Sequence, residues 1–176
     1  MNDLLSDPFS YLTIWSLLIS YSIFIWTIFL GAPKWLFLFA ACFLTTTSIL
    51  GTFFLTIPSA QVDATQYNTT AGEIILKDIP IHSGALIVFL LLFNFLSKRL
   101  ISDKPRILIN KVPILNKPFI FQGYHKTIIV AAIVVFAYLG YIKFDKVYYY
   151  DYFTLVILSA CIFVTSYQIY SSLIKV

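Results

Sequence analysis

The stretch that decides the fold is Trp35–Val62, WLFLFAACFLTTTSILGTFFLTIPSAQV. It contains no Asp, Glu, Lys or Arg, and its first half consists mainly of Phe, Leu and Ala. An α-helix needs about 20 predominantly apolar residues to cross the hydrocarbon core of a bilayer. A lone extended segment could not satisfy its backbone hydrogen bonds in lipid, whereas a helix can. The stretch therefore predicts a transmembrane helix over about 35–57.

The rest of the chain has the same apolar character. Of the 176 residues, 60% are hydrophobic and 11% are charged, whereas a soluble domain carries about 25% charged residues. The expected fold is therefore all-α, a polytopic transmembrane helical bundle that forms one domain over 1–176. We predict an integral protein of a cell membrane or an organelle membrane. Together with 35–57, apolar runs predict five spans, the others at about 10–31, 79–97, 125–143 and 152–174, of which only 125–143 carries charges, Lys126 and Lys143 at its ends.

The basic residues predict how the bundle is oriented. If the N-terminus is exterior or lumenal, nine of the twelve Lys and Arg residues fall on the inner side. Positive charge is retained on the cytoplasmic side of membrane proteins, so an N-out, C-in orientation is favoured. The loop 58–78 is then outside and the loop 97–126 is inside. The inner loop carries Lys98, Arg99, Lys104, Arg106, Lys111, Lys117 and Lys126.

The inner loop is unusually apolar for a charged connection. Its sequence reads SKRLISDKPRILINKVPILNKPFIFQGYHK, and its prolines prevent one continuous helix. We predict short extended pieces with a turn at Asn110–Lys111. The loop has three interpretations: a solvated loop that only fixes orientation, an interfacial flap whose basic residues meet anionic lipids, or a docking surface for another membrane subunit. Nucleic-acid binding is not expected, because no aromatic platform accompanies the charge.

The predicted outer loop contains an N-glycosylation sequon. Asn68-Thr69-Thr70 has the N-x-T pattern, and only an exterior or lumenal Asn can be modified. Asn68 is therefore a candidate acceptor whose position agrees with the orientation given by the basic residues.

The spans lack the residues that most membrane catalysts and pumps use. No Asp, Glu, Lys or Arg lies in the interior of a predicted span, although ion-coupled transport and proton relays usually place one there. His82 and His125 are expected on opposite sides of the membrane and cannot share a metal. Cys42 and Cys161 form no CxxC pair. We expect no catalytic residues of its own, no metal site and no cofactor.

The spans are rich in residues that let helices approach one another. Ser16 and Ser20 form a small-xxx-small pair, and small or hydroxyl residues favour helix contacts in lipid. The amides of Asn94 and Gln168 are expected at a helix contact, within the chain or with a neighbouring subunit, because an unpaired amide in hydrocarbon is costly. The candidate packing residues are Thr45, Thr46, Thr47, Ser48, Asn94 and Gln168.

These features favour a non-catalytic integral membrane subunit of a larger membrane protein complex. Its expected partners are the lipid bilayer, anionic lipids and other membrane subunits. One alternative is a channel or uniporter for a small neutral solute, with Thr45–Ser48 along the path. A second alternative is a lipid- or quinone-handling enzyme, in which Tyr124, His125 and the inner loop form a head-group site.

Overall fold

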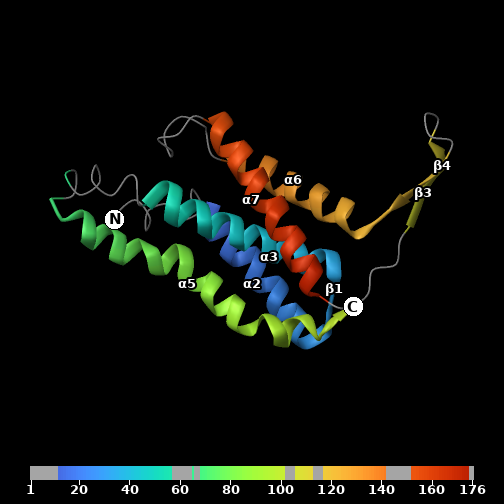
Figure 1. Ribbon diagram of the computed structural model, residues 1–176, viewed down its shortest axis with the longest axis horizontal. Coiled ribbons are helices and arrows are strands. Elements are labelled where there is room, and N and C mark those ends of the chain that lie inside the picture. Colours follow the sequence, from blue (N-terminus) through green and yellow to red (C-terminus); the bar gives the residue numbers. More distant parts are fainter. Residues whose placement is uncertain are drawn as a thin grey trace.

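A computed structural model describes residues 12–56, 65, 68–101, 106–112, 117–141 and 152–174. In these ranges the chain forms long helices that run alongside one another, with short strands at one end (Figure 1). The elements are α2 Leu12–Leu30, β1 Ala32–Pro33, α3 Lys34–Ile49, the π-helix η2 Leu50–Thr56, α5 Ala71–Ser97, β2 Leu100–Ile101, β3 Arg106–Val112, β4 Lys117–Phe121, α6 Gly123–Tyr141 and α7 Tyr152–Leu173.

The helices confirm the all-α fold that the sequence predicts. Among the described residues, four helices are long and apolar enough to cross a bilayer, namely α2, α3 with the start of η2, α5 and α7. In α6 the apolar segment is shorter, Gly123–Ala137. Each predicted span therefore corresponds to a helix, although the apolar segment of α6 is shorter than those of the four helices that could cross a bilayer.

Helix α3 is the centre of the bundle. It contacts α2, α5, α6 and α7, and Figure 1 shows it between α5 on one side and α6 with α7 on the other. Within Lys34–Phe53, 83% of the most apolar window is buried, against 11% in α7. A helix that is apolar on every side must be surrounded by protein or lipid, and α3 is surrounded by protein.

An aromatic cluster fills the space between α3 and three of its neighbours. Phe24 of α2 stacks on Phe89 of α5, with ring centroids 4.7 Å apart. Phe37 of α3 lies 6.0 Å from Phe89, and Tyr170 of α7 meets Phe89 edge-on at 5.7 Å. Phe93 of α5 completes the cluster. Offset and edge-to-face pairs of this kind stabilise a core by about 0.5–1.5 kcal/mol each beyond their burial.

The connection between α2 and α3 is tight. Gly31 has a φ of +72°, a left-handed conformation that glycine adopts without steric cost at the end of a helix. Its N–H donates to the Thr27 carbonyl at 3.2 Å. Directly after it, Ala32 and Pro33 pair in parallel with Leu100 and Ile101 of β2. This pairing holds the α2–α3 turn against the end of α5.

Helix α5 begins at Ala71, eight residues before the start that the apolar run predicts. The loop expected over 58–78 is thus helical in its last part. Thr70 caps the helix by accepting a hydrogen bond from the Glu73 N–H at 3.3 Å, in the manner of a capping box. Pro80 lies inside the helix. The first turns of α5 carry charged residues and lie outside the apolar run. An apolar run marks only the part of a helix that can lie in the hydrocarbon core, so it does not show where a longer helix begins.

The inner loop contains an antiparallel hairpin. Strand β3 pairs with β4 in a register that places Ile107 opposite Ile120 and Val112 opposite Lys117. The two extended pieces agree with the prediction, but a turn at Asn110–Lys111 is wrong, since both residues belong to β3. Figure 1 shows the hairpin projecting from the end of the bundle beyond the helices.

Gly51 of η2 lies close against the side chain of His82. A Cβ at Gly51 would overlap the imidazole of His82, whose Cγ would be 2.7 Å away, whereas a Cβ at Gly84 would meet nothing within 4 Å. We predict that Gly51→Ala lowers the free energy of unfolding by about 1–3 kcal/mol through overpacking. The matched Gly84→Ala should be neutral or slightly stabilising. Thermal unfolding in detergent measures both, and equal melting temperatures would contradict the His82 contact.

Candidate functional site

Hydroxyl groups link α3 to the helices around it. Thr45 Oγ1 lies 2.8 Å from Tyr170 Oη of α7, and Thr47 Oγ1 lies 2.6 Å from Ser16 Oγ of α2. Thr46 donates to the Cys42 carbonyl in its own helix. Ser48 is buried as well. The Thr45–Ser48 stretch therefore packs among helices, and two of its hydroxyls bond to a neighbouring helix.

The same kind of bond recurs at other contacts of the central helix. Ser20 of α2 donates to the Ala40 carbonyl at 2.9 Å. Thr127 of α6 donates to the Trp35 carbonyl at 3.0 Å. Thr52, in η2, lies 2.6 Å from Ser83 Oγ of α5. Such bonds contribute about 0.6–2 kcal/mol each in membrane proteins, so they fix how the outer helices sit against α3 and η2.

The two amides predicted at helix contacts both lie on the outside of the described chain. Asn94 is exposed on α5 and Gln168 is exposed on α7. Asn94 shares its face with Leu91, which is 79% exposed. Neither amide side chain hydrogen-bonds within the part of the chain that the structure describes. A contact with a neighbouring subunit stays a prediction.

The basic residues of the predicted inner side meet at one end of the bundle. The α2–α3 turn, the end of α5, the start of α6 and the end of α7 all lie there. Lys34 Nζ donates to the Ile174 carbonyl at 3.1 Å, Arg99 Nη1 donates to the Ile28 carbonyl at 2.9 Å, and Lys126 Nζ lies 5.7 Å from the centroid of the Trp35 ring. We call this region the basic end.

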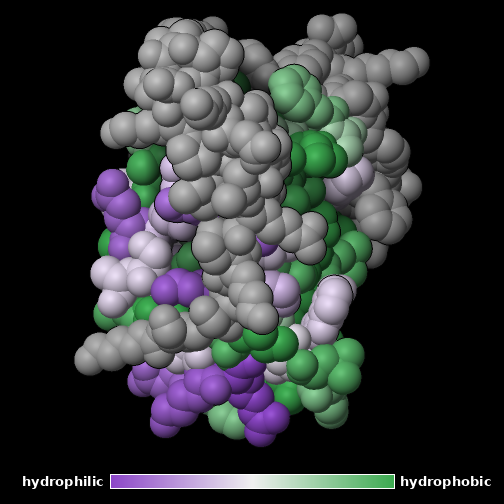
Figure 2. Space-filling model, turned by 90° about the vertical axis from the view of Figure 1, so that its right-hand side faces the viewer, coloured by the Kyte–Doolittle hydropathy of each residue, from purple (hydrophilic) through white to green (hydrophobic). Residues whose placement is uncertain are grey.

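The basic end is partly apolar at its surface. Figure 2 looks onto it and shows hydrophilic groups gathered beside hydrophobic ones. Lys98 and Arg99 are exposed, and the Arg99 guanidinium also lies 5.2 Å from the centroid of the Phe95 ring. Of the other predicted contact residues, Lys104 lies outside the described residues. Arg106, Lys111 and Lys117 belong to the hairpin strands.

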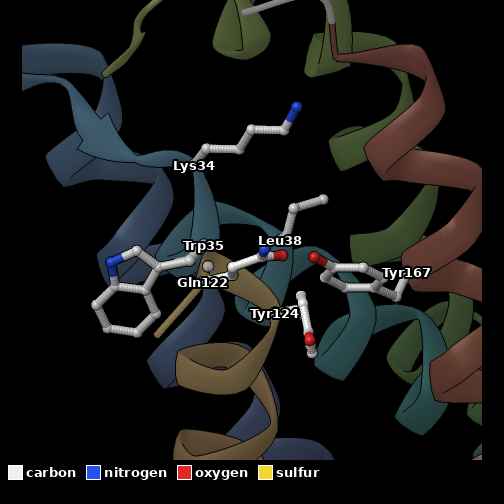
Figure 3. A pocket seen from close by; sticks show the side chains of 7 residues that line it. Lys34, Trp35, Leu38, Gln122, Tyr124 and Tyr167 are labelled. Atoms are coloured by element: carbon white, nitrogen blue, oxygen red, sulfur yellow. The ribbon is translucent and has the colours of Figure 1, made fainter. Parts of the chain in front are cut away.

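A pocket of about 230 Å³ opens at the basic end. It lies where α3 begins, α6 begins and α7 reaches its last turns, and Figure 3 shows it from close by. Leu38 is buried, while Gln122 and Tyr124 are exposed, so the pocket leads from the surface toward the core. Its lining residues are Lys34, Trp35, Leu38, Gln122, Gly123, Tyr124 and Tyr167.

The pocket combines cationic, amide and aromatic groups. In Figure 3 the Gln122 amide and the Tyr167 hydroxyl point toward each other, and Lys34 extends above them. No acidic side chain is among the lining residues. Beside the pocket, His125 stacks on Tyr124 with centroids 3.9 Å apart, and its Nδ1 accepts from the Gln122 N–H at 3.1 Å. The arrangement can therefore hold an anion or a polar group at the surface of an apolar bundle.

The two histidines lie near opposite ends of α3 in the described chain, and their placement on opposite sides of a membrane stays a prediction. His82 contacts Gly51, at the end far from Lys34, and its Nδ1 is 3.0 Å from Thr13 Oγ1. His125 lies at the start of α6, at the basic end. Within the described residues no group of three or more His, Cys, Asp or Glu side chains could hold a metal ion.

The sequon Asn68 is exposed just before α5. It has a φ of 51°, a left-handed conformation that Asn adopts more readily than most residues. Two residues later Thr70 caps α5. The acceptor side chain is thus accessible at the end of the bundle opposite the basic end.

Comparison with known proteins gives no relative. No protein-family model matches the sequence, and no curated protein or solved structure matches it significantly. The function therefore has to be inferred from the residues and their arrangement.

Several pocket residues were not predicted as a site. Lys34 contributes to the count of inner charges, but nothing in the sequence places it beside α6. Gln122 and Tyr167 are 45 residues apart and in different segments. The sequence pattern that could have pointed to the pocket is a polar residue next to an aromatic one at a predicted membrane boundary. This pattern occurs at both ends of most spans, so it does not single out one site.

We predict that the Thr45–Tyr170 bond is an energetic link between α3 and α7. Thr45→Val and Tyr170→Phe should each lower the free energy of unfolding by about 0.6–2 kcal/mol. The double variant should lose scarcely more than either single variant, because both changes remove one bond. Denaturant or thermal unfolding in detergent measures the cycle, with the exposed Thr165→Val as a control that should change little. Fully additive losses would show that the two hydroxyls are independent.

Proposed function

We propose that this protein is a non-catalytic integral membrane subunit of a larger membrane protein complex. Its five helices would all span the bilayer, N-out and C-in, and the basic end would contact anionic lipids and partner subunits. The observation that carries the proposal is the Gln168 amide, exposed on α7 at membrane depth without a hydrogen-bond partner among the described residues.

Gln168 belongs to a polar stripe on the outer face of α7. It lies five residues before the end of a 22-residue helix, about 7.5 Å along the axis, so the amide falls within the hydrocarbon layer. Spacings of four, three and four residues place the members of the stripe on one helix face. All four members are exposed: Cys161, Thr165, Gln168 and Ser172.

A polar stripe that faces lipid suits a partner helix. Small and hydroxyl side chains permit close approach, and an amide hydrogen-bonds across the contact. Left in hydrocarbon, the amide would carry a cost of several kcal/mol. A neighbouring transmembrane helix on α7 removes that cost. Asn94 on the exposed face of α5 offers a second contact of the same chemistry.

The burial of Thr45–Ser48 favours this proposal over a channel. A channel would use these hydroxyls along an open path, whereas all four residues are buried among the helices. The subunit hypothesis explains the exposed amides, which a channel formed by one chain leaves without a role.

The N-out orientation is supported by the basic end itself. The segments that carry Lys34, Lys98, Arg99 and Lys126 meet there, and Asn68 lies at the other end. Retention of positive charge on the cytoplasmic side would place this end inside.

A glycosylation assay tests the orientation. In microsomes, the N-out orientation predicts a mobility shift that Asn68→Gln or endoglycosidase removes. As a matched test of the other side, Val112→Thr creates an acceptor sequence at Asn110 in the hairpin, which should stay unmodified. Modification at Asn110 would place the basic end outside and reject the orientation.

A second prediction addresses assembly. Gln168→Leu should weaken the association constant of the larger complex in mild detergent by about tenfold, since losing one buried amide contact is worth roughly 1.4 kcal/mol. Asn94→Leu should act in the same direction. Because both side chains are exposed in the single chain, its own melting temperature should change little.

The matched control for assembly is Val156→Leu, an apolar change at an exposed residue of α7 that lies about 120° around the helix from Gln168. Native gels and cross-linking through the exposed Cys161 measure the complex. If the wild-type protein runs as a single 20.1 kDa chain and Gln168→Leu changes nothing, the subunit hypothesis is wrong.

A further inference from the structure

We propose that the pocket at the basic end binds the phosphate-bearing head group of an anionic phospholipid. This inference deepens the proposed contact of the basic end with anionic lipids, on which it rests, by assigning that contact to a defined site; it requires no partner subunit. It rests on the cations at the pocket, on its neutral polar groups, on its volume and on its position at the boundary of the apolar bundle.

The pocket is electropositive. Among the described residues, the Lys34 ammonium uses one of its three donors on the Ile174 carbonyl, 3.1 Å away, and the other two have no partner in that part of the chain. Lys126 lies next to the pocket, over the Trp35 ring. Helix α6 begins at the lining residue Gly123, and the N-terminal end of its dipole adds partial positive charge. No Asp or Glu is among the described lining residues, so the described charges favour an anion.

Neutral donors are arranged to bind the remaining oxygens of a head group. The Gln122 amide and the Tyr167 hydroxyl point toward each other across the pocket in Figure 3. The Gln122 amide supplies two N–H donors. Together with Lys34 it offers donors from two different segments, which suits a phosphodiester with its ester and glycerol oxygens.

The surroundings of the pocket fit a lipid better than a free ion. Trp35 and Tyr124 are aromatic residues of the kind that lie at head-group level in membranes. Leu38 is 2% exposed and forms the buried, apolar side of the pocket. A molecule with a charged head and an apolar tail meets both environments at once, whereas inorganic phosphate would leave the apolar side unused.

The volume limits the ligand to a head group. The pocket holds about 230 Å³, below the roughly 300–1,000 Å³ of sites that enclose drug-sized molecules. A phosphate with its glycerol fits this space while the acyl chains remain outside, along the apolar helices. A quinone or a nucleotide would not be enclosed.

Native mass spectrometry tests the site on the full-length protein. The protein is purified in detergent, delipidated and mixed with phosphatidylglycerol or with phosphatidylcholine of the same acyl chains. We expect one phosphatidylglycerol to remain bound per chain, at least tenfold more tightly than phosphatidylcholine. Equal retention of both lipids would overturn the anionic head-group assignment.

Charge variants then locate the bound lipid. Lys126→Gln and Lys34→Gln should each weaken phosphatidylglycerol binding about fivefold, the effect expected for one basic residue near an anionic head group. Lys98→Gln is the matched control: it removes the same charge from an exposed lysine at this end that does not line the pocket. If Lys98→Gln weakens binding as much as the other two, the lipid binds a diffuse basic surface and the pocket is not the site.

Two further measurements keep the result interpretable. Lys34→Gln also removes the bond to Ile174, so its melting temperature is recorded, and Gln122→Leu tests the pocket at an exposed residue outside the helices. No loss of binding in Gln122→Leu or Lys126→Gln would overturn the proposal.

A competition experiment with inorganic phosphate separates a lipid site from a free-ion site. If millimolar phosphate displaces the bound phosphatidylglycerol, the pocket is a free-ion site and the lipid assignment is rejected. All these measurements use the single chain. The lipid site can therefore be rejected while assembly through Gln168 is found, and assembly can be rejected while the lipid site is found.

Discussion

The burial of α3 on every side is the constraint on which the rest of the structure depends. In lipid, the hydrophobic effect does not drive helices together, so packing and interhelical hydrogen bonds decide their arrangement. Hydroxyl groups supply these bonds at the contacts of α3 and η2 with all four neighbouring helices, as in Ser16–Thr47 and Thr45–Tyr170. The aromatic rings around Phe89 fill the space that remains. Because α3 is enclosed, its neighbours are held at fixed positions relative to one another.

That arrangement determines which surfaces remain for partners and lipid. Helix α7 places Tyr170 against α3, so Gln168 and its polar stripe must face outward. Helix α5 directs Phe89 and Phe93 inward and leaves Asn94 outside. At the contact between α3 and α6, the hydrogen bond from Thr127 fixes the start of α6 beside Trp35. This position brings Gln122 and Tyr124 next to Lys34 and Tyr167. The polar outer faces and the pocket are thus both consequences of how the outer helices attach to α3.

The basic end also answers why the charged loop is apolar. Its apolar residues form the paired strands β3 and β4, in which Ile107 lies opposite Ile120 and Ile109 opposite Phe119. The described part of the loop is therefore a hairpin whose strands also carry Arg106, Lys111 and Lys117. A mixture of apolar residues and cations suits the interface between head groups and acyl chains, where the proposed lipid site opens.

The sequence by itself determined the apolar helices and the clustering of basic residues, because hydrophobic length and charge position are local properties. Tertiary structure alone decided that α3 is central and that Gln168 points outward. Lipid is as apolar as leucine, so the hydropathy of a residue does not tell whether its side chain faces lipid or protein. The helix start at Ala71, ahead of the apolar run, depended on the Thr70 cap. The pocket depended on Lys34, Gln122 and Tyr167 meeting across long sequence separations, a placement that only the packing of complete helices creates.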